Sequence, residues 1–471
     1  MPLLAALLFS AVSAQQSPLD EMHRGIEAYL RKLPVKQQPL APHPKLLESD
    51  KCAGAGKPRI VLTYRKLDCG HYPGENIVAP RLIHPSKRER IRRMGYPFGL
   101  VPAGFESSEP KRANEITRPQ EMAFGMAFAQ HDESRIERST EDTTKIESYL
   151  LSLIPQAESE RQRLLQQRGP SEVAKLWHRE VVGQLPKYKG PLNLRQRPHS
   201  ETQSYRATEI IFDALPGVIA QGVLLEAKSG PRRRPLIILQ HGLEGSPEVY
   251  FGQAKDTKDF ATYRNFAEDL LAAGFTVYCP QNPYKGDFRR LQLIAHPRGV
   301  SLFSFIEAQY RRMLDYLETH PSVDKRHIVY YGLSYGGATA LRIPIFDPRF
   351  QAIVCAGNFN DWIPKLIDPS QKFSYIPTRE YEMFEWRQAW VASHAELAAL
   401  GLKLHKRPIP FFVERGHQDT VGIDAWVLRE FERLKTYAPN PGLVRIAFFD
   451  GPHRVDGAEA LPWLKIHAGL Q

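Results

Sequence analysis

The second half of the chain alternates short apolar runs with amphipathic stretches. The apolar runs are rich in β-branched and aromatic residues, as buried strands are, and the stretches between them repeat their apolar residues every three or four positions. From about residue 204 this alternation predicts an α/β fold, with a mostly parallel sheet and helices on both faces. An antiparallel pair is expected to open the sheet at 205–215 and 217–227, followed by strands at 235–242, 275–280, 327–332, 351–357, 409–416 and 444–451.

Helices are expected between these strands. The segment 259–274 is predicted to be one helix, because its aromatic and leucine side chains have helical spacing and Gly274 supplies a stop at its end. A second helix covers 301–320. A third begins directly after Ser334 and must end or kink at Pro344.

The first half of the chain has a different pattern. Residues 15–203 contain few strand-like runs and several helical ones, such as 145–167 and 171–185, separated by Pro-rich and polar stretches. We therefore predict a mainly helical N-terminal accessory region at 15–203 and an α/β domain at 204–471. Within that domain, the long connection at about 358–406 is expected to form a cap-like insertion beside a pocket.

The first fourteen residues have the pattern of a signal peptide. The apolar run 3–12 is too short to span a bilayer, and the small residues Val12 and Ala14 place cleavage before Gln15. The usual basic start is missing, so an apolar N-terminal helix is the alternative. We predict that residues 1–14 direct the protein to a secreted or periplasmic location. No later segment is apolar over the eighteen or so residues of a membrane span.

Composition excludes several classes of protein. Hydrophobic residues make up 42% of the chain and charged residues 24%, a balance typical of globular proteins rather than disordered or multi-span membrane proteins. The net charge of +11 is spread over 471 residues, and the densest basic run, at 87–93, lies in no nucleic-acid-binding motif. We therefore expect no nucleic-acid partner.

The four cysteines fit an exported protein without requiring one. Cys52 and Cys69 lie close together in a loop-rich region, where a disulfide and two free thiols both remain open. Cys279 and Cys355 lie in expected buried strands, where cysteine usually serves as a small hydrophobic residue. The cysteines lack the CxxC spacing that is usual for zinc sites, so we expect no metal, and no motif implies another cofactor.

A Gly-x-Ser-x-Gly motif at 332–336 lies between an expected strand and an expected helix. In such a sharp turn, side chains two positions before and after Ser334 would collide, which explains why glycine stands at both places. The serine hydroxyl then projects above the sheet. This context predicts that Ser334 is a catalytic nucleophile.

A serine nucleophile needs a base, and the base needs a carboxylate to orient it. Asp419 lies in the loop after strand 409–416 and is the expected acid; Glu414, inside that strand, is the competitor, with a structural role as its alternative reading. His453 follows the last strand directly and is the expected base. His417 is expected to pack in its loop or to border the substrate.

The transition state of acyl transfer also needs two donors for its oxyanion. The backbone amide of Tyr335, just after the nucleophile, is expected to be one of them. The turn at 241–245, which follows a buried strand, can offer the amide of Leu243 as the other. Gly242 and Gly245 in that turn have the alternative reading of ordinary turn residues.

Five motifs together resemble the α/β-hydrolase superfamily, and within it an exported branch similar to dienelactone hydrolases and acetyl xylan esterases. The resemblance covers residues from about 204 to 471 and implies an eight-stranded sheet with a triad of Ser334, Asp419 and His453. Dienelactone hydrolases proper use a cysteine nucleophile where this chain has Ser334, which puts their substrate in doubt. The motifs are HGLEG at 241–245, NPYKGDFR at 282–289, GLSYGG at 332–337, ERGHQD at 414–419 and FFDGPH at 448–453.

The leading functional hypothesis is a serine hydrolase that cleaves carboxylic esters of small molecules or carbohydrates through an acyl-enzyme. A serine peptidase with the same triad is the alternative, and a non-catalytic binding protein on a hydrolase fold is the third. Glu382 and Trp386, in the cap-like insertion, are the candidate substrate-binding residues; packing on the core and exposure to solvent are their structural alternatives. The sequence leaves the oligomeric state open.

Overall fold

A computed structural model describes residues 17–35, 148, 152–367, 388 and 390–470. Several expectations fall outside these residues and stay predictions. They are the signal peptide at 1–14, the state of Cys52 and Cys69, the basic run at 87–93, and the substrate-binding roles of Glu382 and Trp386.

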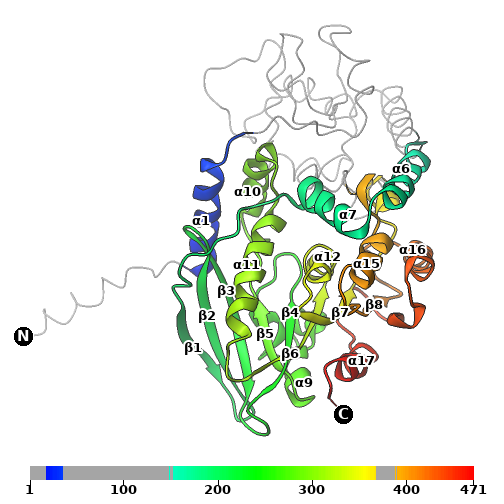
Figure 1. Cartoon of the computed structure of the whole chain (residues 1–471). Helices are drawn as coiled ribbons and strands as arrows, with labels where there is room; N and C mark the ends of the chain where they lie inside the picture. Colours follow the sequence, from blue (N-terminus) through cyan, green and yellow to red (C-terminus); the bar gives the residue numbers. More distant parts are fainter. Residues whose placement is uncertain (1–16, 36–147, 149–151, 368–387, 389, 471) are drawn as a thin grey trace, which may run out of the picture.

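A nine-stranded sheet runs through the described part of the chain (Figure 1), in the order β1-β2-β3-β5-β4-β6-β7-β8-β9. The first three strands and β5 pair antiparallel, and the remaining pairs from β5 to β9 are parallel. This confirms the predicted α/β fold and its antiparallel opening. The strands are β1 (Arg195–Glu201), β2 (Tyr205–Leu215), β3 (Val218–Ala227), β4 (Arg234–Gln240), β5 (Thr276–Pro280), β6 (Val323–Leu333), β7 (Phe350–Ala356), β8 (Phe411–Gly416) and β9 (Val444–Phe449).

The ninth strand is β1, one more than the eight that the family resemblance implies. Its seven residues are all exposed and mostly polar, so it has no alternation of apolar and polar positions that would predict a strand. It pairs antiparallel with β2 at the edge of the sheet. Hydrogen bonding to a neighbouring strand therefore forms β1, rather than burial of its side chains.

Helices cover both faces of the sheet, and each face has its own apolar core. Within the described residues, no helix is long and apolar enough to cross a membrane. One face packs against α1 (Pro18–Lys32), α7 (Pro170–Trp177), α10 (Phe288–Ala295), α11 (Leu302–Leu317), α12 (Tyr335–Ala340), α15 (His394–Lys403) and α16 (Asp424–Tyr437). The other face packs against α8 (Lys258–Tyr263), α9 (Phe266–Ala272) and α17 (Ala460–His467).

The prediction of a single helix at 259–274 is wrong, because the structure divides this segment into α8 and α9. Arg264 and Asn265 between them have left-handed backbones, with φ of 57° and 51°. The Asn265 side chain accepts a hydrogen bond from the backbone of Gln253 at 2.9 Å and donates one to it at 3.0 Å. These hydrogen bonds stabilise the left-handed backbone that interrupts the helix. The spacing of apolar residues in the sequence gives no sign of them.

Helices from the N-terminal region belong to the same core as the sheet. Met22, Ile26 and Leu30 of α1 and Trp177 of α7 are fully buried in the core on their face. The predicted helix at 171–185 is present as α7 and a π-helical turn at His178–Val182. The boundary at residue 204 stays a prediction, and β1 lies before it while belonging to the sheet.

The two cysteines in the described strands are free and buried, as predicted. Burial raises the pKa of the Cys355 thiol in β7 to about 12, and it raises the pKa of the Cys279 thiol in β5 well above its usual value. Both thiols therefore stay protonated and act as small hydrophobic groups.

Candidate active site

Ser334 occupies a strained turn between β6 and α12. Its φ of 62° and ψ of −115° belong to a region that residues with a side chain rarely adopt. The buried strand β6 ends at Leu333, and the amide of Ser334 donates to the carbonyl of Ala356 at 2.9 Å. Hydrogen bonds to the neighbouring strand therefore hold the strained residue at the carboxyl edge of the sheet.

The two glycines of the motif are required by close backbone contact, as the sequence predicts. A Cβ atom on Gly332 would lie 2.4 Å from the carbonyl of Gly336. A Cβ atom on Gly336 would lie 2.2 Å from the carbonyl oxygen of Gln240, at the end of β4. The turn thus packs against both β6 and β4 without room for a side chain.

Asp419 and His453 are hydrogen bonded to each other. They follow β8 and β9, which run parallel to β6, so the loops after all three strands meet at one edge of the sheet. The Nδ1 atom of His453 lies 2.8 Å from Oδ2 of Asp419. Because a carboxylate only accepts, Nδ1 carries the proton and Nε2 is left as an acceptor.

Asp419 is enclosed by its own loop. Its side chain is 1% exposed, and Oδ1 accepts from the amide of Val421 at 2.7 Å. The Nη1 atom of the buried Arg415 in β8 lies 3.6 Å from Oδ2 of Asp419. The Arg415 guanidinium also donates hydrogen bonds to the backbone carbonyls of Asp419 and Val421, at 2.9 and 2.7 Å. Arg415 therefore fixes the backbone that presents the acid.

Glu414, the competing carboxylate, has other partners. It accepts from the hydroxyl of Tyr331 and from the amides of Asp456 and Gly457, at 3.1 and 2.9 Å for the two amides. Burial raises the pKa of Glu414, and these three donors oppose the shift. Glu414 thus ties the loop after His453 to the sheet.

His417 packs in its loop, which was one of its two expected roles. Its Nδ1 lies 2.7 Å from Oδ2 of Asp424, and its ring stacks on Phe448 with the ring centroids 5.0 Å apart. Through both contacts, His417 packs its loop against α16 and β9.

The turn at 241–245 is held from several sides. Tyr263 accepts a hydrogen bond from the amide of Gly242 at 3.1 Å, and the amide of Glu244 donates to the carbonyl of Tyr284 at 2.8 Å. Between them, the amide of Leu243 meets no hydrogen-bond acceptor among the described residues. An unpaired amide held this way is available to a ligand.

His241 anchors the base of this turn. It is fully buried, and burial lowers its pKa to about 4, so the imidazole is neutral near pH 7. Its Nδ1 donates to the carbonyl of Gly242 at 2.8 Å, and its Nε2 lies 3.5 Å from the amide of Asn282.

A pocket of about 490 Å³ brings the candidate groups together. Ser334, Tyr335, His453 and Leu243 all line it, and Asp419 reaches it through His453. The arrangement joins a strained serine, a histidine paired with a carboxylate and an unpaired amide on one surface.

Another part of the pocket wall comes from the residues after β7. Asn358 lines the pocket, and its carboxamide oxygen is buried with no hydrogen-bond partner among the described residues. Trp362 and Lys365 of α13 (Trp362–Ile367) also line it, and the Lys365 ammonium lies 3.9 Å from the centre of the Trp362 ring. This described part of the 358–406 insertion thus contributes to a pocket, while the cap-like insertion itself stays a prediction.

Sequence reasoning missed Arg415, His241, Asn358 and Gly357. Gly357, with φ of 63°, follows β7, and a Cβ atom on it would lie 2.7 Å from Cε1 of His453. Its place directly after a strand was a usable signal, because this edge carries the other site residues. Arg415 gave no signal, since most of its hydrogen bonds go to backbone carbonyls of the loop that follows it.

A family model for the alpha/beta hydrolase fold matches residues 235–407. This range runs from β4, through the serine turn, to the connection before β8. The chain has the alpha/beta hydrolase fold. No curated protein matches the sequence.

Solved structures of this hydrolase fold resemble the chain at low sequence identity. A glucuronoyl esterase from Solibacter usitatus is 16% identical with a TM-score of 0.48, covering 63% of this chain and 91% of its own. Acetyl xylan esterase 1 from Thermoanaerobacterium is 15% identical with a TM-score of 0.43, covering 64% and 93%. A glucuronoyl esterase from Teredinibacter turnerae is 14% identical with a TM-score of 0.46, covering 64% and 83%. At these identities the likeness concerns the fold.

Proposed function

We propose that this protein is a serine hydrolase that cleaves carboxylic esters through an acyl-enzyme. The observation that carries the proposal is the hydrogen bond between His453 Nδ1 and Asp419 Oδ2, in a pocket that His453 shares with Ser334. With the proton of the neutral ring on Nδ1, Nε2 of His453 can act as the general base.

In the proposed reaction, Ser334 attacks the ester carbonyl while Nε2 of His453 takes the hydroxyl proton. The carbonyl oxygen gains negative charge, which the amides of Leu243 and Tyr335 stabilise by donating hydrogen bonds. His453 then gives its proton to the leaving alcohol, and the acyl group stays on Ser334. Water, activated by the same histidine, releases the acid and restores the serine.

Asp419 serves this cycle by fixing the proton on Nδ1 and stabilising the imidazolium that forms at each step. Arg415 and the amide of Val421 hold the aspartate in turn. Asn358 lines the same pocket and adds a polar residue to its wall. Every step uses only residues of the chain and water.

A fluorophosphonate probe tests the nucleophile. Wild-type protein should be labelled on Ser334, and Ser334→Ala should lose both the label and several orders of magnitude in turnover. Ser334→Gly should be equally inactive but more stable than Ser334→Ala, by about 1 kcal/mol or more, because glycine adopts a φ of 62° without strain. Activity above one tenth of wild type in either variant would mean that another nucleophile operates.

A substrate panel tests the bond that is cleaved. Acetyl, feruloyl, methyl and glucuronoyl esters should be hydrolysed by wild-type protein, and a dipeptide amide should not. Faster turnover of the dipeptide than of every ester would instead support the peptidase.

A further inference from the structure

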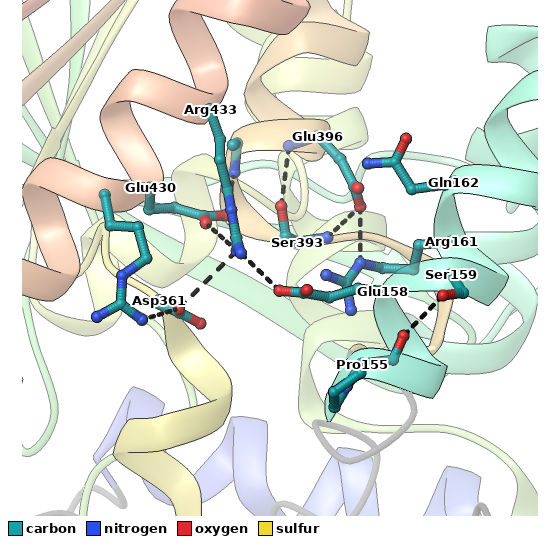
Figure 2. A network of polar contacts seen from close by, with 12 residues as sticks. Pro155, Glu158, Ser159, Arg161, Gln162, Asp361, Ser393, Glu396, Glu430 and Arg433 are labelled. Carbon is teal, nitrogen blue, oxygen red and sulfur yellow. Dashed lines mark hydrogen bonds and ion pairs between the residues drawn. The ribbon is translucent and has the colours of Figure 1, made fainter. Parts of the chain in front are cut away.

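Charged residues of α6 (Ile154–Gln167) join the N-terminal region to α15 and α16. Arg161 Nε donates to Glu396 Oε2 at 3.0 Å, and Arg433 Nη2 donates to Glu158 Oε1 at 2.5 Å. Figure 2 shows both contacts as dashed lines. The side chains of Arg161 and Glu396 are 3% and 2% exposed. Because a buried charge is strongly destabilising without its partner, this pair fixes α6 against α15.

Arg433 of α16 extends the contact from Glu158 to Asp361. Its Nη1 lies 3.3 Å from Glu430 Oε2 and 3.8 Å from Asp361 Oδ2, and Nη1 of Arg429 lies 3.2 Å from the same Asp361 oxygen. Burial raises the pKa of Asp361, and the two arginines oppose the shift. The charge on Asp361 therefore depends in part on Arg433, which Glu158 helps to hold.

Asp361 directly precedes the pocket wall. The next residue, Trp362, begins α13, and Trp362 and Lys365 line the pocket together with Ser334. A shift of the Asp361 carboxylate would turn the first residues of α13. The chain of contacts from α6 thus ends one residue away from a side chain that borders the candidate site.

Charge, more than apolar packing, attaches α6 to the rest of the molecule. Its buried residues in the described structure are Ala157 and Arg161, and Leu164 and Leu165 are partly buried. By contrast, α11 buries eleven side chains. A helix with so little buried apolar surface depends on its ion pairs for its position.

We propose that α6 is a positioning element for the substrate pocket. Through Glu158, Arg433 and Asp361 it sets where Trp362 and Lys365 stand, and thereby which esters fit beside Ser334. The kinetic part of this inference rests on the proposed ester hydrolysis. The link from α6 to α13 does not. Glu158, Arg433 and Asp361 are positioning residues, since each acts through the next.

Glu158→Gln tests the link kinetically, with Glu160→Gln as its matched control. Glu160 lies on the same helix and pairs with Arg163 at 2.6 Å, but that pair is exposed and contacts no other element in the part of the chain that the structure describes. The ratio of kcat/KM for p-nitrophenyl acetate to that for p-nitrophenyl octanoate should change at least threefold in Glu158→Gln, through KM. The kcat for the acetate should stay within twofold of wild type. Asp361→Asn should move the ratio in the same direction, and Glu160→Gln should leave it unchanged.

Amide hydrogen exchange tests the same link without catalysis. In Glu158→Gln, exchange over residues 362–367 should become at least threefold faster than in wild type, and Glu160→Gln should not change it. If Glu158→Gln matches Glu160→Gln in exchange, or in the substrate ratio, α6 is a structural helix and the proposal is overturned. If wild-type protein hydrolyses neither ester and Ser334 is not labelled, the proposed function fails, and the exchange measurement still decides whether α6 positions α13.

Discussion

At the scale of residues, the buried carboxylates of Glu414 and Asp419 have different hydrogen-bond partners, although they come from nearby positions in the sequence. Asp419 gives one oxygen to His453 and the other to the amide of Val421. Glu414 gives its oxygens to a tyrosine hydroxyl and two backbone amides. Residue type does not separate them, whereas position does, because Glu414 lies inside β8 and Asp419 lies beyond its carboxyl end.

Asp419→Asn should lower kcat by up to about 10⁴, because an amide favours the wrong tautomer of His453. Glu414→Gln should act mainly on stability, since the glutamine has one acceptor oxygen for three donors. Steady-state kinetics and urea unfolding on both variants separate these effects. A larger loss of kcat in Glu414→Gln, at unchanged stability, would make Glu414 the catalytic acid.

His241 should make the protein acid-sensitive. Burial lowers its pKa from 6.5 to about 4, so the unfolded chain binds the proton more tightly and stability falls as the pH drops through that window. The free energy of unfolding should lose about 2 kcal/mol through this group between pH 7.5 and pH 5. His241→Asn, measured by urea unfolding at both pH values, should lose correspondingly less than wild type. An equal loss in both proteins would show that His241 does not titrate this way.

At the scale of elements, the serine turn depends on the approach of β4, β6 and α12. Gly336→Ala should destabilise the protein by about 1–3 kcal/mol or more, because its Cβ would lie 2.2 Å from the Gln240 carbonyl oxygen in a backbone that cannot yield easily. Gly169→Ala is the control, since a Cβ there meets nothing within 4 Å. Thermal unfolding of both variants measures the difference, and similar melting temperatures would contradict the tight turn.

The elements that the sequence predicts well are those whose burial creates a pattern. The strands at 235–242 and 351–357 are mostly apolar because helices cover both faces of the sheet, and the structure has them as β4 and β7, in which every residue is buried. The serine turn is predictable because steric crowding demands glycine at fixed offsets. These patterns are local, so they can be read without knowledge of the tertiary structure.

The elements that the sequence misses depend on distant partners. Strand β1 buries no side chain, and the break between α8 and α9 depends on bonds from Asn265 to Gln253. Arg161 and Glu396 are 235 residues apart, and nothing near either residue in the sequence indicates the other. For the same reason, the polar wall at Asn358 could not be expected before the fold had placed it by the pocket.

At the scale of the whole molecule, the N-terminal helices complete the core of the hydrolase fold. A chain that begins at residue 204 would lack α1, α7 and β1, and with them the buried Met22, Ile26, Leu30 and Trp177. We expect such a chain to lose cooperative thermal unfolding, because the exposed sheet face is apolar. A chain that begins at Ser17 is the control and should unfold cooperatively. Near-ultraviolet circular dichroism would show the loss of packing, and a native spectrum for the shorter chain would make the N-terminal region dispensable.

Strand β1 also determines how one molecule meets another. An edge strand offers a row of unpaired peptide groups on which a second chain can add a strand, the first step of aggregation. Here the edge is built of charged and polar side chains, and Pro198 removes one amide donor beside an irregularity in the pairing with β2. The edge strand β1 therefore pairs poorly with a strand of another molecule. The polar composition that makes β1 hard to predict from the sequence also opposes sheet-to-sheet association between molecules.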